Sequence, residues 1–84
     1  MITEQAQRTS WIKKTPDVVG GKPCIRNTRI SVHGLVEWRI LGRSDEEIIE
    51  SIVGLTKDDL EEAWRYYDAN REEIQEILRV EEEA

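Results

Sequence analysis

The strongest constraint on the fold of this chain is a series of helix start and stop signals at short intervals. Ser31, Ser44 and Thr56 each stand where the side chain of an N-cap residue accepts a backbone hydrogen bond. Gly42 and Gly54 stand where a helix ends in a left-handed residue. An acid follows Ser44 and Thr56 at the third position, as in a capping box. These signals predict three short helices joined by tight connections.

Apolar residues recur at helical spacing in each predicted helix, and the first helix is expected over about residues 32–41. The apolar stripes consist of Val32, Leu35, Val36 and Ile40, then of Ile48, Ile49, Ile52 and Val53, and then of Leu60, Ala63, Trp64 and Tyr67. One buried stripe on each helix predicts a mainly α, three-helix bundle. The second and third helices have the tight turn of a helix-turn-helix, although any three-helix bundle needs such turns.

The residues before the helices predict a small β arm. Trp11 and Ile12 precede a proline that favours extended backbone before it, and Gly20-Gly21-Lys22-Pro23 indicates a tight turn. Cys24-Ile25 is expected to be extended. Residues 1–10 are polar and are expected to form a flexible N-terminus, so the arm and the three helices form a domain over residues 11–69.

The C-terminal segment, residues 70–84, is acidic and amphipathic. Asn70 is a further N-cap candidate, and the segment ends in three consecutive glutamates before the last residue. Its apolar side is narrow, so we expect this helix to be marginal alone in water and to need a surface to pack against. That surface is its own core, a second copy or a different protein, and the sequence does not distinguish these three.

The size of the chain limits it to one small core. A domain of 84 residues buries a modest share of its surface, which favours a homodimer. Cys24 and His33 are the single cysteine and histidine, which excludes an intrachain disulfide and a zinc site with three or four Cys/His ligands. No apolar run approaches the roughly 18 residues of a membrane span, so we expect a cytoplasmic protein.

Charge is distributed unequally along the chain. Residues 1–43 hold eight Lys and Arg against three acids, whereas residues 44–84 hold four against fifteen. The basic half suits phosphate, and the acidic half suits a basic partner. The nucleic-acid-binding candidates are Lys13, Lys14, Lys22, Arg26, Arg29, Arg39 and Arg43. The alternative is that these cations are scattered over the surface and only keep the protein soluble.

No catalytic set emerges from the sequence. Cys24 and His33 lack a recognisable orienting group, and Gly20-Gly21-Lys22 lacks the spacing of a phosphate loop. We therefore expect no enzymatic activity, no cofactor and no metal. The predicted third helix has more acids than bases and is expected to repel phosphate, which disfavours the usual docking of a helix-turn-helix on DNA.

The run Gly-Gly-Lys-Pro-Cys-Ile-Arg-Asn-Thr-Arg-Ile, from Gly20 to Ile30, resembles the domain of unknown function 433 family. The resemblance extends over about residues 11–67 and includes Gly42 to Ile48 and Gly54 to Thr56. Family members usually have glycine at the position of Asn27, and asparagine also tolerates a left-handed turn. The resemblance implies a homeodomain-like three-helix fold after a β segment, similar to VapB-type antitoxins whose genes neighbour those of PIN-like ribonuclease toxins.

Two functions follow from these observations. In the first, the chain is an antitoxin that neutralises a PIN-like nuclease and autoregulates its promoter, and its acidic segment occupies the nuclease's substrate groove. The partner-binding residues would be Glu72, Glu73, Ile74, Glu76, Ile77 and Leu78. In the second, the chain is a homodimeric DNA-binding regulator without a toxin partner.

The run Arg26 to Arg29 has two interpretations. In one, a polar loop presents two guanidinium groups to phosphate or carboxylate. In the other, Asn27 and Thr28 satisfy the backbone of a turn, while the arginines pair with acids such as Glu37 or Asp45. The structural interpretation is slightly favoured.

Overall fold

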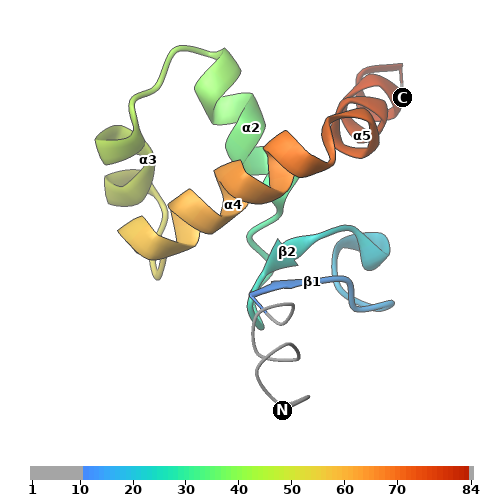
Figure 1. Cartoon of the computed structure of the whole chain (residues 1–84), viewed down its shortest axis with the longest axis horizontal. Helices are drawn as coiled ribbons and strands as arrows, with labels where there is room; N and C mark the ends of the chain where they lie inside the picture. Colours follow the sequence, from blue (N-terminus) through green and yellow to red (C-terminus); the bar gives the residue numbers. More distant parts are fainter. Residues whose placement is uncertain (1–10, 84) are drawn as a thin grey trace.

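The computed structural model describes residues 11–83 and has four α-helices and a two-stranded antiparallel sheet (Figure 1). The elements are β1 (Ile12–Lys13), the 3-10 helix η1 (Val19–Gly21), β2 (Cys24–Ile25), α2 (Val32–Ile40), α3 (Asp45–Ser51), α4 (Lys57–Ala69) and α5 (Arg71–Glu83). The mainly α fold with a small β arm is confirmed. The expected flexible N-terminus, residues 1–10, lies outside the described residues.

The helices begin where the sequence predicts them. Ser31 Oγ accepts the Gly34 N–H at the start of α2. Complete capping boxes open α3, between Ser44 and Glu47, and α4, between Thr56 and Asp59. Each box satisfies two backbone N–H groups that a helix otherwise leaves without partners. Local sequence therefore sets these three helix starts.

Replacing Ser44 with alanine is expected to lower the free energy of unfolding by about 1 kcal/mol, because the N-cap bond to the Glu47 N–H is lost. Urea unfolding followed by circular dichroism measures the change. Ser51→Ala is the matched control, since Ser51 is exposed at the other end of α3 and alanine favours the helix there. Equal effects of the two substitutions would show that capping does not stabilise α3.

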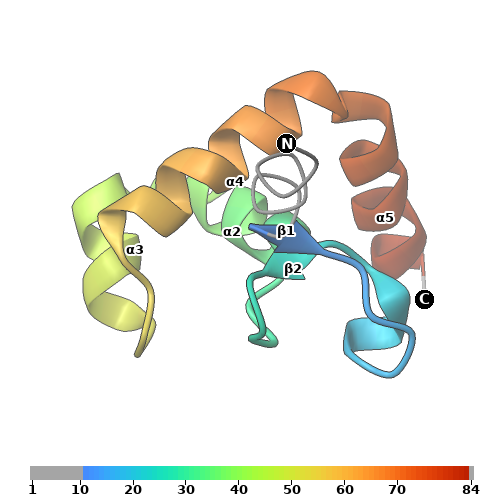
Figure 2. The same ribbon diagram turned by 60° about the horizontal axis from the view of Figure 1, so that its bottom comes forward.

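The core lies where α2, α4 and α5 meet, with contributions from β2, from α3 and from the turn before α4. Its fully buried members are Ile25, Val32, Leu35, Val36, Ile48, Leu55, Leu60, Ala63 and Ile74. Figure 2 shows α4 crossing the molecule, with α3 near one end, α5 near the other and the sheet below. Trp11, Trp38 and Trp64 are partly buried against this core, which contains no phenylalanine.

The expected three-helix bundle is corrected to four helices. α5 packs against both α2 and α4, and Ile74 on α5 has no solvent exposure. The C-terminal segment therefore covers its own core, which answers the question that its amphipathic pattern left open. A narrow apolar stripe is sufficient because it packs against two helices at once.

Two residues of the predicted apolar stripes are exposed. Ile40 is 67% exposed, because it lies in the last turn of α2, beyond the contact with the core. Val53 is 97% exposed, because α3 ends at Ser51 and Val53 falls in the following turn. Helical spacing therefore predicts burial correctly only where another part of the fold covers the apolar face of the helix.

The β arm is short and is tied to the core through its turn. Ile12 pairs with Ile25, and Lys13 pairs with Cys24. The left-handed residue after β2 is Arg26, with φ of 45°, and its N–H donates to the Trp11 carbonyl at 2.6 Å. The left-handed position of this turn is thus Arg26, although the sequence suggested Asn27.

Candidate functional site

The outward face of α5 is acidic. α5 carries six glutamates and two arginines. A shallow hollow of about 620 Å³ runs along this face and is lined by Glu72, Glu73, Gln75, Glu76 and Arg79. Arg79 pairs with Glu76 and Glu83 along the helix, and this pairing lowers the pKa of Glu76. The remaining carboxylates give the face a net negative charge.

The structure divides the predicted partner-binding residues between two faces of α5. Glu72, Glu73 and Glu76 lie together on the hollow described above. Ile74 is fully buried, and Ile77 and Leu78 pack partly buried against the core. Ile74 therefore stabilises the domain and cannot anchor a partner while α5 stays packed. Of the apolar residues predicted to bind a partner, Leu78 also lines a second hollow.

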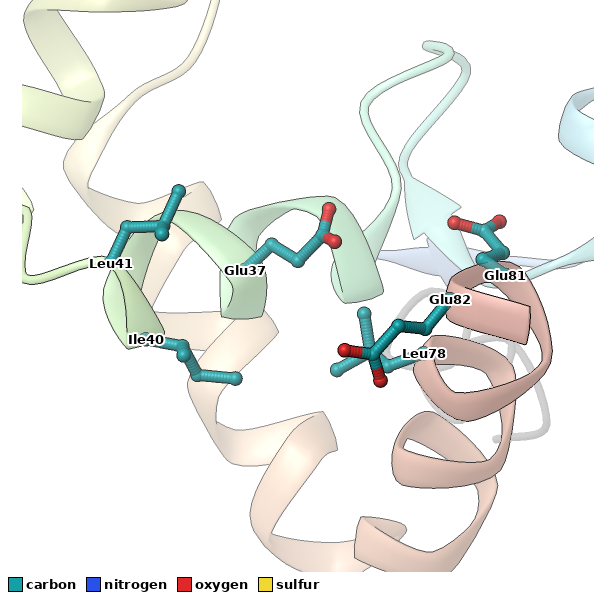
Figure 3. A pocket seen from close by; sticks show the side chains of 6 residues that line it. All are labelled: Glu37, Ile40, Leu41, Leu78, Glu81 and Glu82. Atoms are coloured by element: carbon teal, nitrogen blue, oxygen red, sulfur yellow. The ribbon is translucent and has the colours of Figure 1, made fainter. Parts of the chain in front are cut away.

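This second hollow, which we call the α2–α5 groove, lies between the C-terminal part of α2 and the last turns of α5 (Figure 3). It has a volume of about 400 Å³. It is lined by Glu37, Ile40, Leu41, Leu78, Glu81 and Glu82. Three aliphatic side chains and three carboxylates thus line the groove, and no cation lines it among the described residues.

His33 connects α2 to α5 at the edge of this groove. Its side chain is 6% exposed, and its Nε2 lies 3.1 Å from Glu81 Oε2. Its other ring nitrogen, Nδ1, is buried without a hydrogen-bond partner in the part of the chain that the structure describes. The contact fixes Glu81 on one side of the groove and helps to hold α5 on α2.

Four of the seven cations predicted to bind nucleic acid are engaged by other side chains. These contacts are Lys13 with Asn27, Lys14 with Glu73, Arg26 with Asp59, and Arg39 over the ring of Trp64. Lys22, Arg29 and Arg43 form no ion pair with an acid within residues 11–83. A phosphate ligand would therefore compete with existing contacts at most of the predicted positions.

Arg26 and Asp59 form the best-developed polar contact of the fold. Arg26 donates from Nε to Oδ1 at 2.8 Å and from Nη2 to Oδ2 at 2.6 Å, and Trp11 Nε1 donates to Oδ1 at 3.1 Å. The Thr56 N–H donates to Oδ2 at 3.0 Å in the capping box. One carboxylate that is 1% exposed thus joins the β arm, its turn and the start of α4.

These contacts lower the pKa of Asp59. The hydrogen bonds from Arg26 hold the pKa of the Asp59 carboxyl far below its usual range, against the opposing effect of burial. Thr56 and Trp11 lower the pKa further. Asp59 is therefore ionised at neutral pH. The structural interpretation is confirmed for Arg26, which forms an ion pair within the fold, but its partner is Asp59 and not Glu37 or Asp45.

The rest of the Arg26 to Arg29 run also serves the turn. Thr28 Oγ1 donates to the Ile25 carbonyl at 2.6 Å and accepts the Ile30 N–H at 3.1 Å. Asn27 Oδ1 accepts from Lys13 Nζ at 2.9 Å. Within the run Arg26 to Arg29, Arg29 is exposed and makes no side-chain hydrogen bond or ion pair in the described chain.

A second polar cluster fastens the arm to α5. Lys14 Nζ lies 2.7 Å from Glu73 Oε2, and Tyr66 donates its hydroxyl to Glu73 Oε1 at 2.7 Å. Burial opposes ionisation of Glu73, but the bonds from Lys14 and Tyr66 outweigh it and lower the pKa of Glu73. Glu73 is thus partly committed within the fold, whereas Glu72 is exposed.

Other candidate chemistry is limited in the described chain. Cys24 is 2% exposed, and burial raises the pKa of its thiol, so the thiolate is disfavoured. Residues 11–83 contain no cluster of three His, Cys, Asp or Glu side chains suited to a metal ion. Within the same residues, no helix is long and apolar enough to cross a membrane.

Sequence reasoning missed Asp59, Glu81 and the α2–α5 groove. The capping pattern predicts a role for one face of the Asp59 carboxylate but gives no sign of Arg26, which lies 33 positions away. Glu81 belongs to the run of three glutamates, and its contact with His33 needs one further turn of α5 beyond Leu78. The one sequence signal that could have indicated the groove is Ile40, an apolar residue in the last turn of a helix.

Comparisons with known proteins place the chain by sequence and by fold. A family model described as Protein of unknown function (DUF433) matches residues 12–67. The structure is similar to the crystal structure of a DUF433 member protein from Anabaena variabilis ATCC 29413, with 40% sequence identity and a TM-score of 0.82. That similarity covers 93% of this chain and 77% of the other. No curated protein matches the chain.

Proposed function

The chain belongs to the DUF433 family, as its Gly20 to Ile30 motif predicted, and from this premise we propose that it is an antitoxin-like binding protein that neutralises a PIN-like ribonuclease. The observation that supports the proposal is the acidic face of α5, which a packed core holds in place. Glu72 and Glu76 are exposed on this face. The surface therefore suits a basic partner better than a phosphate.

The mechanism follows from what an RNA-cleaving partner must provide. A nuclease that binds RNA needs cations along its substrate groove, and these cations also attract a row of carboxylates. Here the carboxylates lie on a helix that Ile74 fixes to the core, so little conformational entropy is lost on binding. The α5 face thereby occupies the groove as a mimic of the RNA backbone.

Reversing two charges on this face is expected to weaken capture of the nuclease. The variant carries Glu72→Lys and Glu76→Lys, both at exposed positions, so the fold is retained. We expect an affinity loss of about tenfold or more, because attraction to the basic groove becomes repulsion. The measurement is an affinity pull-down from native host lysate treated with nuclease to remove bridging RNA and DNA, followed by mass spectrometry.

The matched control reverses two exposed glutamates elsewhere, with Glu50→Lys on α3 and Glu61→Lys on α4. It changes net charge by the same amount and is expected to retain the partner. Equal retention of a PIN-like protein by all three proteins would contradict a contact through the α5 face. Recovery of no PIN-like protein by the wild-type chain would contradict the proposed function itself.

A homodimeric DNA-binding regulator with a homeodomain-like helix-turn-helix, formed by α3 and α4, is the alternative proposal. Gly54, with φ of 88°, provides the turn between these helices. However, Asp58, Glu61 and Asp68 are exposed on α4 and disfavour its approach to phosphate. Fluorescence anisotropy with promoter DNA distinguishes the two functions, because only the regulator binds DNA without the nuclease and loses affinity steeply as salt rises.

A further inference from the structure

We propose that the α2–α5 groove binds a basic amphipathic helix of the partner protein, an inference that rests on the proposed function. The groove is separate from the outward α5 face, since the two hollows share no lining residue. It supplies what that face lacks, namely apolar side chains beside carboxylates. Figure 3 shows these side chains along α2 and the last turns of α5.

Two of the three aliphatic side chains that line the groove, Ile40 and Leu41, lie outside the core. Ile40 is 67% exposed and Leu41 is 77% exposed, and they follow each other at the end of α2. Burying large aliphatic side chains against a partner lowers the free energy of the complex. Leu78 continues this apolar surface from α5, so a ligand lying between the helices contacts apolar atoms on both sides.

The charges around the groove select the ligand. Glu37 and Glu82 form no ion pair within residues 11–83, and Glu81 is held by His33 on the α2 side. Leu41 is also the C-cap of α2, where the helix dipole adds partial negative charge. Phosphates, nucleotides and acidic peptides are repelled here. A ligand that brings both cations and aliphatic groups is complementary.

The shape favours a helix over a small molecule. The groove is open, is bounded by two helices and presents three aliphatic contacts without a hydrogen-bond donor to orient a polar ligand. A helix with apolar residues at positions i, i+3 or i+4 and i+7 places them in a row, with lysines or arginines beside them. A second copy of this chain is disfavoured, because two grooves with the same acidic rim would repel each other.

The probe for this inference is a synthetic four-turn helix of about 14 residues with leucines on one face and lysines on the other. Its matched control has glutamate in place of each lysine. Binding is measured by isothermal titration calorimetry at physiological salt, and two-dimensional NMR of the ¹⁵N-labelled full chain maps the contact. We expect the basic peptide to bind, with the largest shifts at residues 37–41 and 78–82, and the acidic peptide not to bind.

A variant with Ile40→Asn and Leu41→Asn separates the groove from general charge attraction. Both positions are exposed, so the fold is retained, and the net charge does not change. We expect the affinity for the basic peptide to fall about tenfold. Val53→Asn is the control, because Val53 is 97% exposed outside the groove, and its affinity is expected to stay within about twofold.

Several outcomes would overturn the inference. It fails if the basic peptide does not bind, if its shifts lie on α3 and α4, or if the Ile40 and Leu41 replacements leave its affinity unchanged. It also fails if the wild-type chain is a dimer in sedimentation and the same variant is a monomer, since the occupant would then be a second copy. If nuclease capture depends on Glu72 and Glu76 but not on Ile40 and Leu41, the groove is not a binding site for the nuclease, and the proposed function is kept. If the groove binds the basic peptide but the chain captures no nuclease, the groove is kept as a binding site and the proposed function is rejected.

Discussion

Replacing Ile74 with alanine is expected to lower the free energy of unfolding by about 2 to 5 kcal/mol, which is a large part of the stability of a domain this small. Ile74 has no solvent exposure and joins α5 to the core formed with α2 and α4. The loss combines the transfer of the removed atoms with the cavity that they leave. Chemical denaturation monitored by tryptophan fluorescence measures it.

The control is Val80→Ala on the same helix. Val80 is 49% exposed, so its truncation is expected to change the free energy of unfolding by less than about 0.5 kcal/mol. A chain that ends at Ala69 removes Ile74 together with all of α5, and we expect it to be largely unfolded. If Ile74→Ala were no more destabilising than Val80→Ala, α5 would not belong to the core.

The second large effect is expected for Asp59→Ala, with a loss of about 2 to 3 kcal/mol. About 1 kcal/mol comes from the capping-box bond that the Asp59 carboxylate accepts from the Thr56 N–H, and the rest comes from the charged hydrogen bonds to Arg26. The Arg26 side chain is 42% exposed, so water screens part of the ion pair. The expected loss in free energy of unfolding is therefore smaller than for an ion pair in which both partners are buried. Urea unfolding of the variant measures the loss.

Asp58→Ala is the matched control, because Asp58 lies in the same first turn of α4 but is exposed. The Asp58→Ala variant retains the contacts of Asp59 and loses only a favourable interaction with the helix dipole. We expect its free energy of unfolding to fall by about 0.3 to 1 kcal/mol. Equal losses in the two variants would contradict a special role for Asp59. An intermediate test is Arg26→Gln, which removes the ion pair and keeps the capping box.

The Asp59 contribution also predicts a pH dependence. The pKa of Asp59 is lowered in the folded state, so its stabilisation is fully present above the unfolded pKa of about 4 and is lost as pH falls through the folded value. The difference in free energy of unfolding between wild type and Asp59→Ala should therefore narrow below about pH 4. A difference that stayed constant down to strongly acidic pH would contradict the ion pair.

Helix positions could be predicted from sequence because their causes are local. The Ser44 to Glu47 box and the glycine after α2 act within a few residues, so the pattern contains the whole interaction. The role of α5 could not be predicted in this way. A stripe such as Ile74 and Ile77 shows that one face must be covered but does not show what covers it.

The candidate site illustrates the same limit. The Glu72 to Glu76 face was predicted because charge on an exposed helix depends on the sequence alone. The Arg26 contact with Asp59 and the α2–α5 groove depend on segments far apart in the chain, which only the packed helices bring together. Cations that looked available in the sequence, such as Arg26, are therefore committed to the fold.

The most direct test of the account is the inhibition of RNA cleavage by a purified PIN-like nuclease from the native host. We expect the folded full-length chain to stop cleavage at equimolar concentration, and we expect the variant with Glu72→Lys and Glu76→Lys to need about tenfold more protein for the same effect. The variant with Glu50→Lys and Glu61→Lys should inhibit like wild type. Cleavage that continues unchanged in excess of the folded wild-type chain would contradict the central claim.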